Sequence, residues 1–155
     1  MQGHCPCGTV RYELAAEPLI VHCCHCTWCQ RETGSAFVLN ALIETRHVVL
    51  ECGSVEYDIL PSESGQGQKV ARCVTCHGIL WSHYADSGPR LAFVRVGTLE
   101  SARLVKPDVH IFALSAHPWV LLSSEVPVFR EFYDRAAIWT PEALARRESE
   151  LRRRD

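Results

Sequence analysis

The sequence predicts a mostly β domain with short peripheral helices and one C-terminal helix. Short apolar segments separated by turn residues recur along the chain, which is typical of β domains. Only two segments carry helix-capping signals, and both lie outside these apolar runs. With 155 residues, 47% of them hydrophobic and 22% charged, the chain has the size and composition of a single globular domain spanning residues 1–155.

Eight segments are predicted as strands. They are 9–14, 36–43, 47–50, 55–60, 70–73, 79–84, 91–96 and 109–114. The first alternates apolar and polar residues, as expected of a half-buried strand. The segments 47–50 and 55–60 are predicted as neighbours joined through Gly53, and residues 61–68, rich in Ser and Gly, as a loop.

Two segments are predicted as helices. Residues 27–33 form a short one that ends at Gly34. The second begins after Thr140, a good N-cap residue, with Pro141 at its first position, and runs to about Arg153. Because only two leucines form its apolar stripe, this C-terminal extension, about 140–153, is expected to pack lightly on the domain.

Several function classes are disfavoured by composition. No stretch approaches the roughly 18 apolar residues of a membrane span, and the N-terminus lacks the basic and apolar regions of a signal peptide. The formal net charge of -2 gives no basic face for nucleic acid, and the run 152–154 is interpreted as a solvated helix end. We therefore expect a cytoplasmic protein without membrane or nucleic-acid partners. Seven of its nine cysteines are expected to bind metal, and none to form disulfides.

The first and third cysteine clusters predict a closed metal site. One is a Cys-x-Cys pair, Cys5 and Cys7, and the other a Cys-x-x-Cys pair, Cys73 and Cys76. Short loops of this kind can direct several sulfurs at one ion, and four thiolates complete the tetrahedral sphere of Zn²⁺. The pattern therefore predicts a structural zinc held by these four residues.

The middle cluster predicts a different kind of site. Its Cys-x-Cys-x-x-Cys pattern supplies three sulfurs, from Cys24, Cys26 and Cys29. Three protein ligands with one exchangeable position is the arrangement of catalytic zinc. The alternative is a second closed site completed by His22, Cys23 or His25.

The charge of an open three-thiolate site indicates its chemistry. Zn²⁺ with three thiolates carries a net charge near -1, so it is a poorer Lewis acid than zinc bound to three neutral histidines. It is less suited to activating water and better suited to a soft fourth ligand, such as a thiol held as its nucleophilic thiolate. The ligand set therefore favours chemistry on a thiol substrate.

The same residues carry a resemblance to a known family. The motifs are Gly3-x-Cys5-x-Cys7-Gly8-x-Val10-x-Tyr12, Cys24-His25-Cys26-x-x-Cys29 with Thr33-Gly34-Ser35-Ala36-Phe37, Cys73-x-x-Cys76, and Pro107-Asp108-Val109-His110-Ile111-Phe112 with Pro118-Trp119. This pattern, over about residues 3–133, resembles the glutathione-dependent formaldehyde-activating (GFA) family, which includes centromere protein V.

The resemblance implies a compact zinc-bound β fold with two Zn²⁺ per chain. It implies a structural zinc on the four cysteines of the outer clusters and a catalytic zinc on Cys24, Cys26 and Cys29. The family's named activity joins glutathione and formaldehyde into S-hydroxymethylglutathione, and the reverse reaction is that of a carbon–sulfur lyase. A small thiol such as glutathione and an aldehyde are therefore the expected partners. Two departures are Cys23, interpreted as a spare thiol, and His77, expected to face solvent.

Other side chains have two interpretations each. His110 lies in an apolar segment and is interpreted as a core or surface histidine rather than a proton carrier. Trp28 either packs or walls a substrate pocket. Arg31 and Lys69 could meet glutathione carboxylates but are expected to be solvated, and Arg72 could offset the thiolate charge of the neighbouring Cys73.

Three functions fit these residues. The first is a zinc-dependent carbon–sulfur lyase acting on a glutathione-type thiol adduct. The second is a non-catalytic zinc-stabilised binding module, distinguished by a protein side chain as the fourth ligand of the second zinc. The third is a thiol carrier or redox sensor that uses Cys23 and Cys52.

Overall fold

A computed structural model describes residues 1–122 and 124–153. The chain is mostly β, with two sheets and a few short helices, as the sequence predicts. The smaller sheet has the strand order β1 (Gln2–His4), β2 (Arg11–Leu14), β5 (Val48–Cys52). The larger sheet has the order β10 (Val109–Ile111), β3 (Ile20–Cys24), β4 (Val38–Glu44), β9 (Leu91–Arg95), β8 (Ile79–Tyr84), β7 (Gln68–Cys73), β6 (Val55–Leu60). Its strands are antiparallel except for the parallel pair of β10 and β3.

Two buried clusters of apolar side chains lie on the larger sheet. One joins it to the smaller sheet, where Tyr12 of β2 meets Trp81 of β8 edge to face at 5.7 Å between ring centroids. The other covers β3, β4 and β10 with side chains of the C-terminal segment, including Tyr133 and Trp139. The C-terminal segment is therefore part of the domain's core, because it buries a sheet face that would otherwise meet water.

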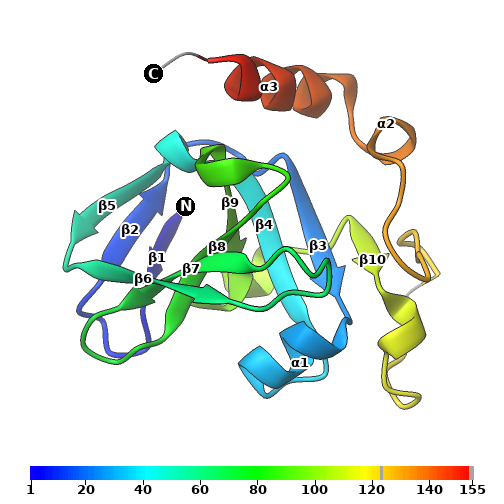
Figure 1. Ribbon diagram of the computed structural model, residues 1–155, viewed down its shortest axis with the longest axis horizontal. Helices are drawn as coiled ribbons and strands as arrows, with labels where there is room; N and C mark the ends of the chain where they lie inside the picture. Colours follow the sequence, from blue (N-terminus) through cyan, green and yellow to red (C-terminus); the bar gives the residue numbers. More distant parts are fainter. Residues whose placement is uncertain (123, 154–155) are drawn as a thin grey trace.

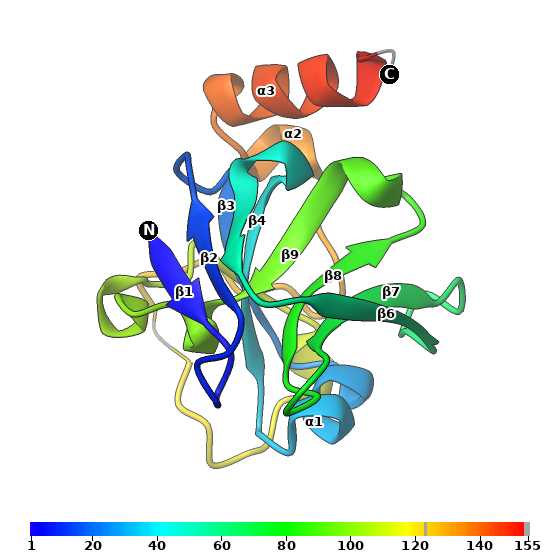
Figure 2. The same cartoon turned by 90° about the vertical axis from the view of Figure 1, so that its left-hand side faces the viewer.

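The predicted helices form at the expected residues. α1 is Thr27–Thr33 and ends at Gly34, whose φ of 65° is the left-handed conformation that glycine adopts without strain. α3 is Pro141–Arg152, and the Thr140 hydroxyl accepts a hydrogen bond from the Ala143 N–H at 3.1 Å. In both ribbon views these helices lie at opposite ends of the domain (Figures 1 and 2). Arg154, the end of the basic run, lies outside the described residues.

Ion pairs anchor α3 more firmly than its thin apolar stripe suggests. Arg146 binds the carboxylate of Glu44 at 2.7 Å, and Arg46 binds that of Glu150 at 2.8 Å. Glu44 and Glu150 are both buried. Charged partners far away in the sequence thus hold this helix on the domain. The pattern of apolar residues within the helix gives no sign of such ion pairs.

Besides the short 3-10 turns, two strands and one helix were not predicted: β1, β3 and α2 (Arg135–Ile138). β3 is buried on both faces, so its sequence Ile-Val-His-Cys-Cys lacks the alternation of a half-buried strand. The two strands predicted as neighbours around Gly53 belong to different sheets, since β5 pairs with β2 and β6 pairs with β7. At Gly53 the chain passes against Thr9, whose carbonyl oxygen would lie 2.4 Å from an added Cβ.

The predicted strand 109–114 is shorter in the structure. It ends at Ile111 because Phe112 adopts a left-handed conformation with φ 55° and a 3-10 turn follows at Ala113–Ser115. Among the described residues, no helix is long and apolar enough to cross a membrane.

Candidate metal centres and cavity

The fold brings Cys5, Cys7, Cys73 and Cys76 together, with all four sulfurs within 4.8 Å of one another. Cys5 and Cys7 lie in the loop between β1 and β2, while Cys73 ends β7 and Cys76 lies in the turn before β8. The Cys5 and Cys7 sulfurs are 3.4 Å apart, and those of Cys7 and Cys73 are 3.9 Å apart. Bonds of about 2.3 Å to a tetrahedral zinc require sulfurs about 3.8 Å apart, so these four residues fit such an ion.

Backbone N–H groups point at two of these sulfurs. Val10 donates to Cys5 Sγ at 3.2 Å and Thr75 donates to Cys73 Sγ at 3.3 Å. The N–H groups of Cys76 and Thr75 lower the pKa of Cys73 below its ordinary value. Because hydrogen bonds to a sulfur stabilise its charged form, the turn after β7 favours the Cys73 thiolate that metal binding requires. Burial outweighs the Val10 hydrogen bond at Cys5 and raises its pKa to about 11.

The residues that follow Cys76 have separate roles. His77 is exposed, as predicted, and its Nδ1 lies 3.0 Å from the Glu56 carboxylate rather than beside the sulfurs. Gly78 lets two loops meet, because a Cβ there would lie 2.8 Å from Pro6 Cδ. This glycine therefore allows the first cluster to close on the third.

The second group of sulfurs comes from Cys24, Cys26 and Cys29, again all within 4.8 Å. Cys24 ends β3, Cys26 is the N-cap of α1 and Cys29 lies within that helix. The Cys29 N–H donates to Cys26 Sγ at 3.4 Å. Hydrogen bonds with Cys24 and Cys29 lower the pKa of Cys26, while hydrogen bonds with Cys26 and Cys29 raise that of Cys24. The strand-to-helix turn thus presents three coupled sulfurs to one point.

The three residues considered as a fourth ligand are directed elsewhere. Successive side chains of a strand point to opposite faces, so Cys23 lies on the other side of β3 from Cys24. It joins a separate buried group in which His25 Nε2 lies 3.5 Å from Cys23 Sγ and 2.9 Å from His110 Nδ1. His110 is buried in this group, as its apolar segment predicts.

The third candidate, His22, is held by an aromatic pair from the C-terminal segment. Its Nε2 lies 2.6 Å from the Tyr133 hydroxyl, which accepts a hydrogen bond from Trp139 Nε1 at 2.7 Å. An indole N–H can only donate, so the Tyr133 hydroxyl accepts from Trp139 and also forms a hydrogen bond with His22 Nε2. Burial lowers the pKa of His22 to about 4, which keeps the ring neutral at pH 7.

A buried ion pair lies beside the three sulfurs. Arg95 binds the Glu32 carboxylate and donates to Asn40 Oδ1 at 2.6 Å, and Gln68 donates to Glu32 at 2.9 Å. Arg95 is close enough for its charge to act on Cys29. Sequence reasoning missed this pair, because an arginine at the end of an apolar strand gives no sign of being buried.

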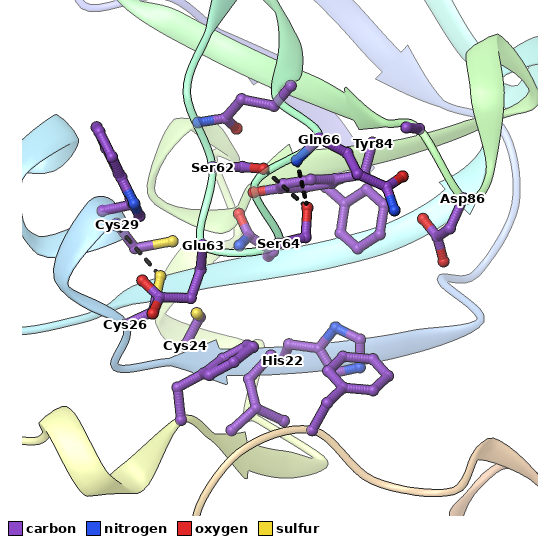
Figure 3. Close-up of a pocket in the computed structure, with 18 of the residues that line it drawn as sticks. His22, Cys24, Cys26, Cys29, Ser62, Glu63, Ser64, Gln66, Tyr84 and Asp86 are labelled. Atoms are coloured by element: carbon purple, nitrogen blue, oxygen red, sulfur yellow. Dashed lines mark hydrogen bonds between the residues drawn. The ribbon is translucent and has the colours of Figure 1, made fainter.

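The three-cysteine group opens into a cavity of about 300 Å³, and no residue of the four-cysteine group lines it. Figure 3 shows the three sulfurs at one end, Asp86 at the other, and residues 62–66 of the loop between β6 and β7 along one side. Trp28 lines this cavity, so its pocket interpretation is the one the structure favours. From the sequence, only Trp28 and the Cys-x-Cys-x-x-Cys motif indicated residues that line this cavity.

The cations considered for substrate carboxylates or thiolate charge do not line this cavity. Lys69 lies 4.5 Å from the centre of the Tyr57 ring, and Arg72 pairs with Asp58 at 2.8 Å. Arg31 lies exposed on α1. Cys52 is exposed in the smaller sheet and Cys23 is buried in the larger one, so the structure gives no support to a dithiol made of these two.

Comparisons with known proteins agree with this geometry. A family model described as "Glutathione-dependent formaldehyde-activating enzyme" matches residues 1–115, which include both cysteine groups. The chain belongs to this family. A crystal structure of a Rhodobacter sphaeroides protein, 23% identical, matches with a TM-score of 0.51 and covers 83% of this chain and 100% of its own, which shows a shared fold. Among curated proteins, none matches the chain.

Proposed function

We propose that this GFA-family chain is a zinc-dependent carbon–sulfur lyase acting on adducts of a small thiol and an aldehyde. Cys5, Cys7, Cys73 and Cys76 would hold a structural zinc, and Cys24, Cys26 and Cys29 a catalytic one. Glutathione and formaldehyde, the pair in the family's description, are the first substrates to test.

One observation carries this proposal. The three-sulfur group faces the cavity, while Cys23 and His25 belong to a separate buried group. His22 also lines the cavity, but its Nε2 is engaged by the Tyr133 hydroxyl. A site built only for stability needs a fourth protein ligand, and within the described residues no Cys, His, Asp or Glu joins these three. The free direction is therefore available to a ligand that enters through the cavity.

Zinc bound to the three sulfurs would hold the sulfur of a substrate thiol as its thiolate, the nucleophilic form. In the synthetic direction a sulfur–carbon bond forms to the aldehyde, the carbonyl electron pair moves to oxygen, and that oxygen takes up a proton. The reverse reaction breaks the same bond. The cavity contributes proximity between the two reactants, and the buried Arg95–Glu32 pair places positive charge beside a cluster of negative sulfurs.

The test is exchange NMR on an equilibrium mixture of glutathione and formaldehyde. Three samples are compared: wild-type protein, the Cys29→Ser variant and no protein. The blank is essential because the two reactants combine without an enzyme. Faster exchange with wild type alone, accompanied by the loss of one zinc from the variant, supports the proposal.

Equal exchange rates in all three samples would remove this substrate pair. If wild type also failed with other thiol and aldehyde pairs, the non-catalytic binding module would replace the enzyme. Zinc content measured on the same samples distinguishes an inactive holoprotein from a protein that has lost its metal.

A further inference from the structure

Aromatic rings supply much of the apolar lining of the cavity, alongside the polar side chains of Asn40, Ser62, Ser64, Gln66 and Gln68. Its rings are those of Trp28, Tyr84, Phe93, Phe112 and Phe132, together with the imidazole of His22. Tyr84 and Phe93 meet edge to face, with ring centroids 4.7 Å apart. Trp28 and Phe132 remain 37% and 43% exposed at the opening. Apolar rings left accessible around a concave site are best covered by an apolar ligand, because each Å² removed from water contributes about 25 cal/mol.

The charges in the lining are mostly negative. Glu63 and Asp86 supply two carboxylates, and Arg135 supplies the one guanidinium among the described lining residues. Arg135 is already engaged, with Asp86 at 2.6 Å and with its guanidinium over the Phe132 ring at 5.4 Å. Arg135 and Asp86 thus neutralise each other, so Glu63 leaves the described lining with a net charge of about -1. The three sulfurs add further negative charge when deprotonated.

This lining does not match glutathione. At neutral pH glutathione carries two carboxylates and one ammonium, so its net charge has the same sign as the lining. Lys69 and Arg31, the cations considered for its carboxylates, do not line the cavity. Like charges within such a site cost free energy, and each glutathione carboxylate would leave water without a positive partner.

We propose that the substrate thiol of this site carries an apolar, uncharged body, such as an arylalkyl group. The thiol sulfur would lie at the three-cysteine end, and the body would lie along the aromatic rings toward Asp86. This inference rests on the proposed function, since it specifies the substrate of the same centre. The reaction is unchanged: the thiol adds to the aldehyde carbon, and the aldehyde oxygen gains the proton.

The experiment compares three thiols with formaldehyde by exchange NMR: benzyl mercaptan, glutathione and the diethyl ester of glutathione. Each is measured against its own blank, with the holoprotein and with Cys29→Ser. We expect at least about tenfold greater acceleration for benzyl mercaptan than for glutathione, from the aromatic burial. The diester should lie between them, because it removes both carboxylates and keeps the peptide.

A charge variant separates electrostatics from shape. Replacing Glu63 and Asp86 together, as Glu63→Gln with Asp86→Asn, should raise the ratio of the acceleration for glutathione to that for benzyl mercaptan about tenfold. Glu148→Gln, which removes an exposed carboxylate on α3 outside the cavity lining, is the matched control and should leave this ratio unchanged.

The outcomes are distinguishable. If wild type accelerates glutathione as much as benzyl mercaptan or more, this inference is overturned while the proposed function stands. If the holoprotein accelerates none of the three thiols, the proposed function fails and the inference fails with it. If glutathione is slower but the double variant does not improve it, the charge argument is refuted.

Discussion

The two cysteine groups use the same ligand atom in different surroundings. The four-cysteine group ties the β1–β2 loop to the β7–β8 turn, and backbone N–H groups contact its sulfurs. The three-cysteine group spans a strand end and a helix start and faces a cavity of about 300 Å³. The difference shows that the number of sulfurs and what lies beyond them, rather than the residue type, separate a site suited to stability from one suited to chemistry.

The largest expected effect breaks the four-cysteine group. Cys73→Ser should leave the protein largely unfolded, because a structural zinc contributes roughly 10–16 kcal/mol of apparent binding free energy, comparable to the whole stability of a domain. Cys29→Ser should retain the fold and one zinc. Thermal melts and zinc content of both variants, measured together, check this. Equal losses of Tm would refute the division into structural and catalytic sites.

The next effect concerns the ion pair beside the three-cysteine group. Arg95→Met leaves the Glu32 carboxylate, whose side chain is 9% exposed, without its cation. Breaking a buried pair in this way costs about 3–5 kcal/mol, so we expect Tm to fall by about 10 °C or more. The same variant should weaken zinc binding at Cys24, Cys26 and Cys29 and leave the other zinc in place.

Arg152→Met is the matched control for Arg95→Met. Arg152 pairs with Glu148 on the exposed face of α3, where both side chains are more than half exposed. Exposed pairs contribute about 0–1 kcal/mol, so its Tm should stay near that of wild type. A similar fall in both variants would mean that the Arg95 pair is not special to the site.

The sequence was sufficient to predict which cysteines lie together and insufficient for what surrounds them. The spacing of the cysteines predicted both groups, because closely spaced cysteines in a short loop place their sulfurs near one another. Capping residues predicted α1 and α3 almost to the residue. β3 was missed because it is buried on both faces, so its apolar and polar residues do not alternate. Arg95 and Tyr133 were missed because each has a hydrogen-bond partner more than 60 residues away in the sequence.

A smaller effect on stability is expected from the ion pair between Glu44 and Arg146, which attaches α3 to the domain. Burial raises the pKa of Glu44, but its hydrogen bond with Arg146 and further favourable interactions outweigh this, so the pKa lies below its ordinary value. A depressed carboxyl pKa adds stability above the unfolded value, near pH 4.5, and this stability is lost as pH falls below it. Arg146→Met should cost about 1–3 kcal/mol at pH 7 and flatten the loss between pH 5 and 3.

That prediction is checked by denaturant unfolding at several pH values, with wild type and Arg146→Met side by side. An unchanged pH profile in the variant would show that Glu44 does not contribute the acid-sensitive stability. Zinc binding to thiolates also weakens as pH falls, so zinc content measured at each pH identifies the range over which wild type and variant keep the same metal.

The smallest expected effect concerns Cys23, the thiol adjacent to the three-cysteine group in sequence. It points to the opposite face of β3, beside His25 and His110. Cys23→Ala should therefore leave two zinc ions per chain and unchanged thiol–aldehyde exchange, with at most about 1 kcal/mol lost from the small cavity it creates. A drop in exchange together with the loss of a zinc would make Cys23 the fourth ligand. The three-cysteine group would then be closed like the four-cysteine group, and the contrast between them would disappear.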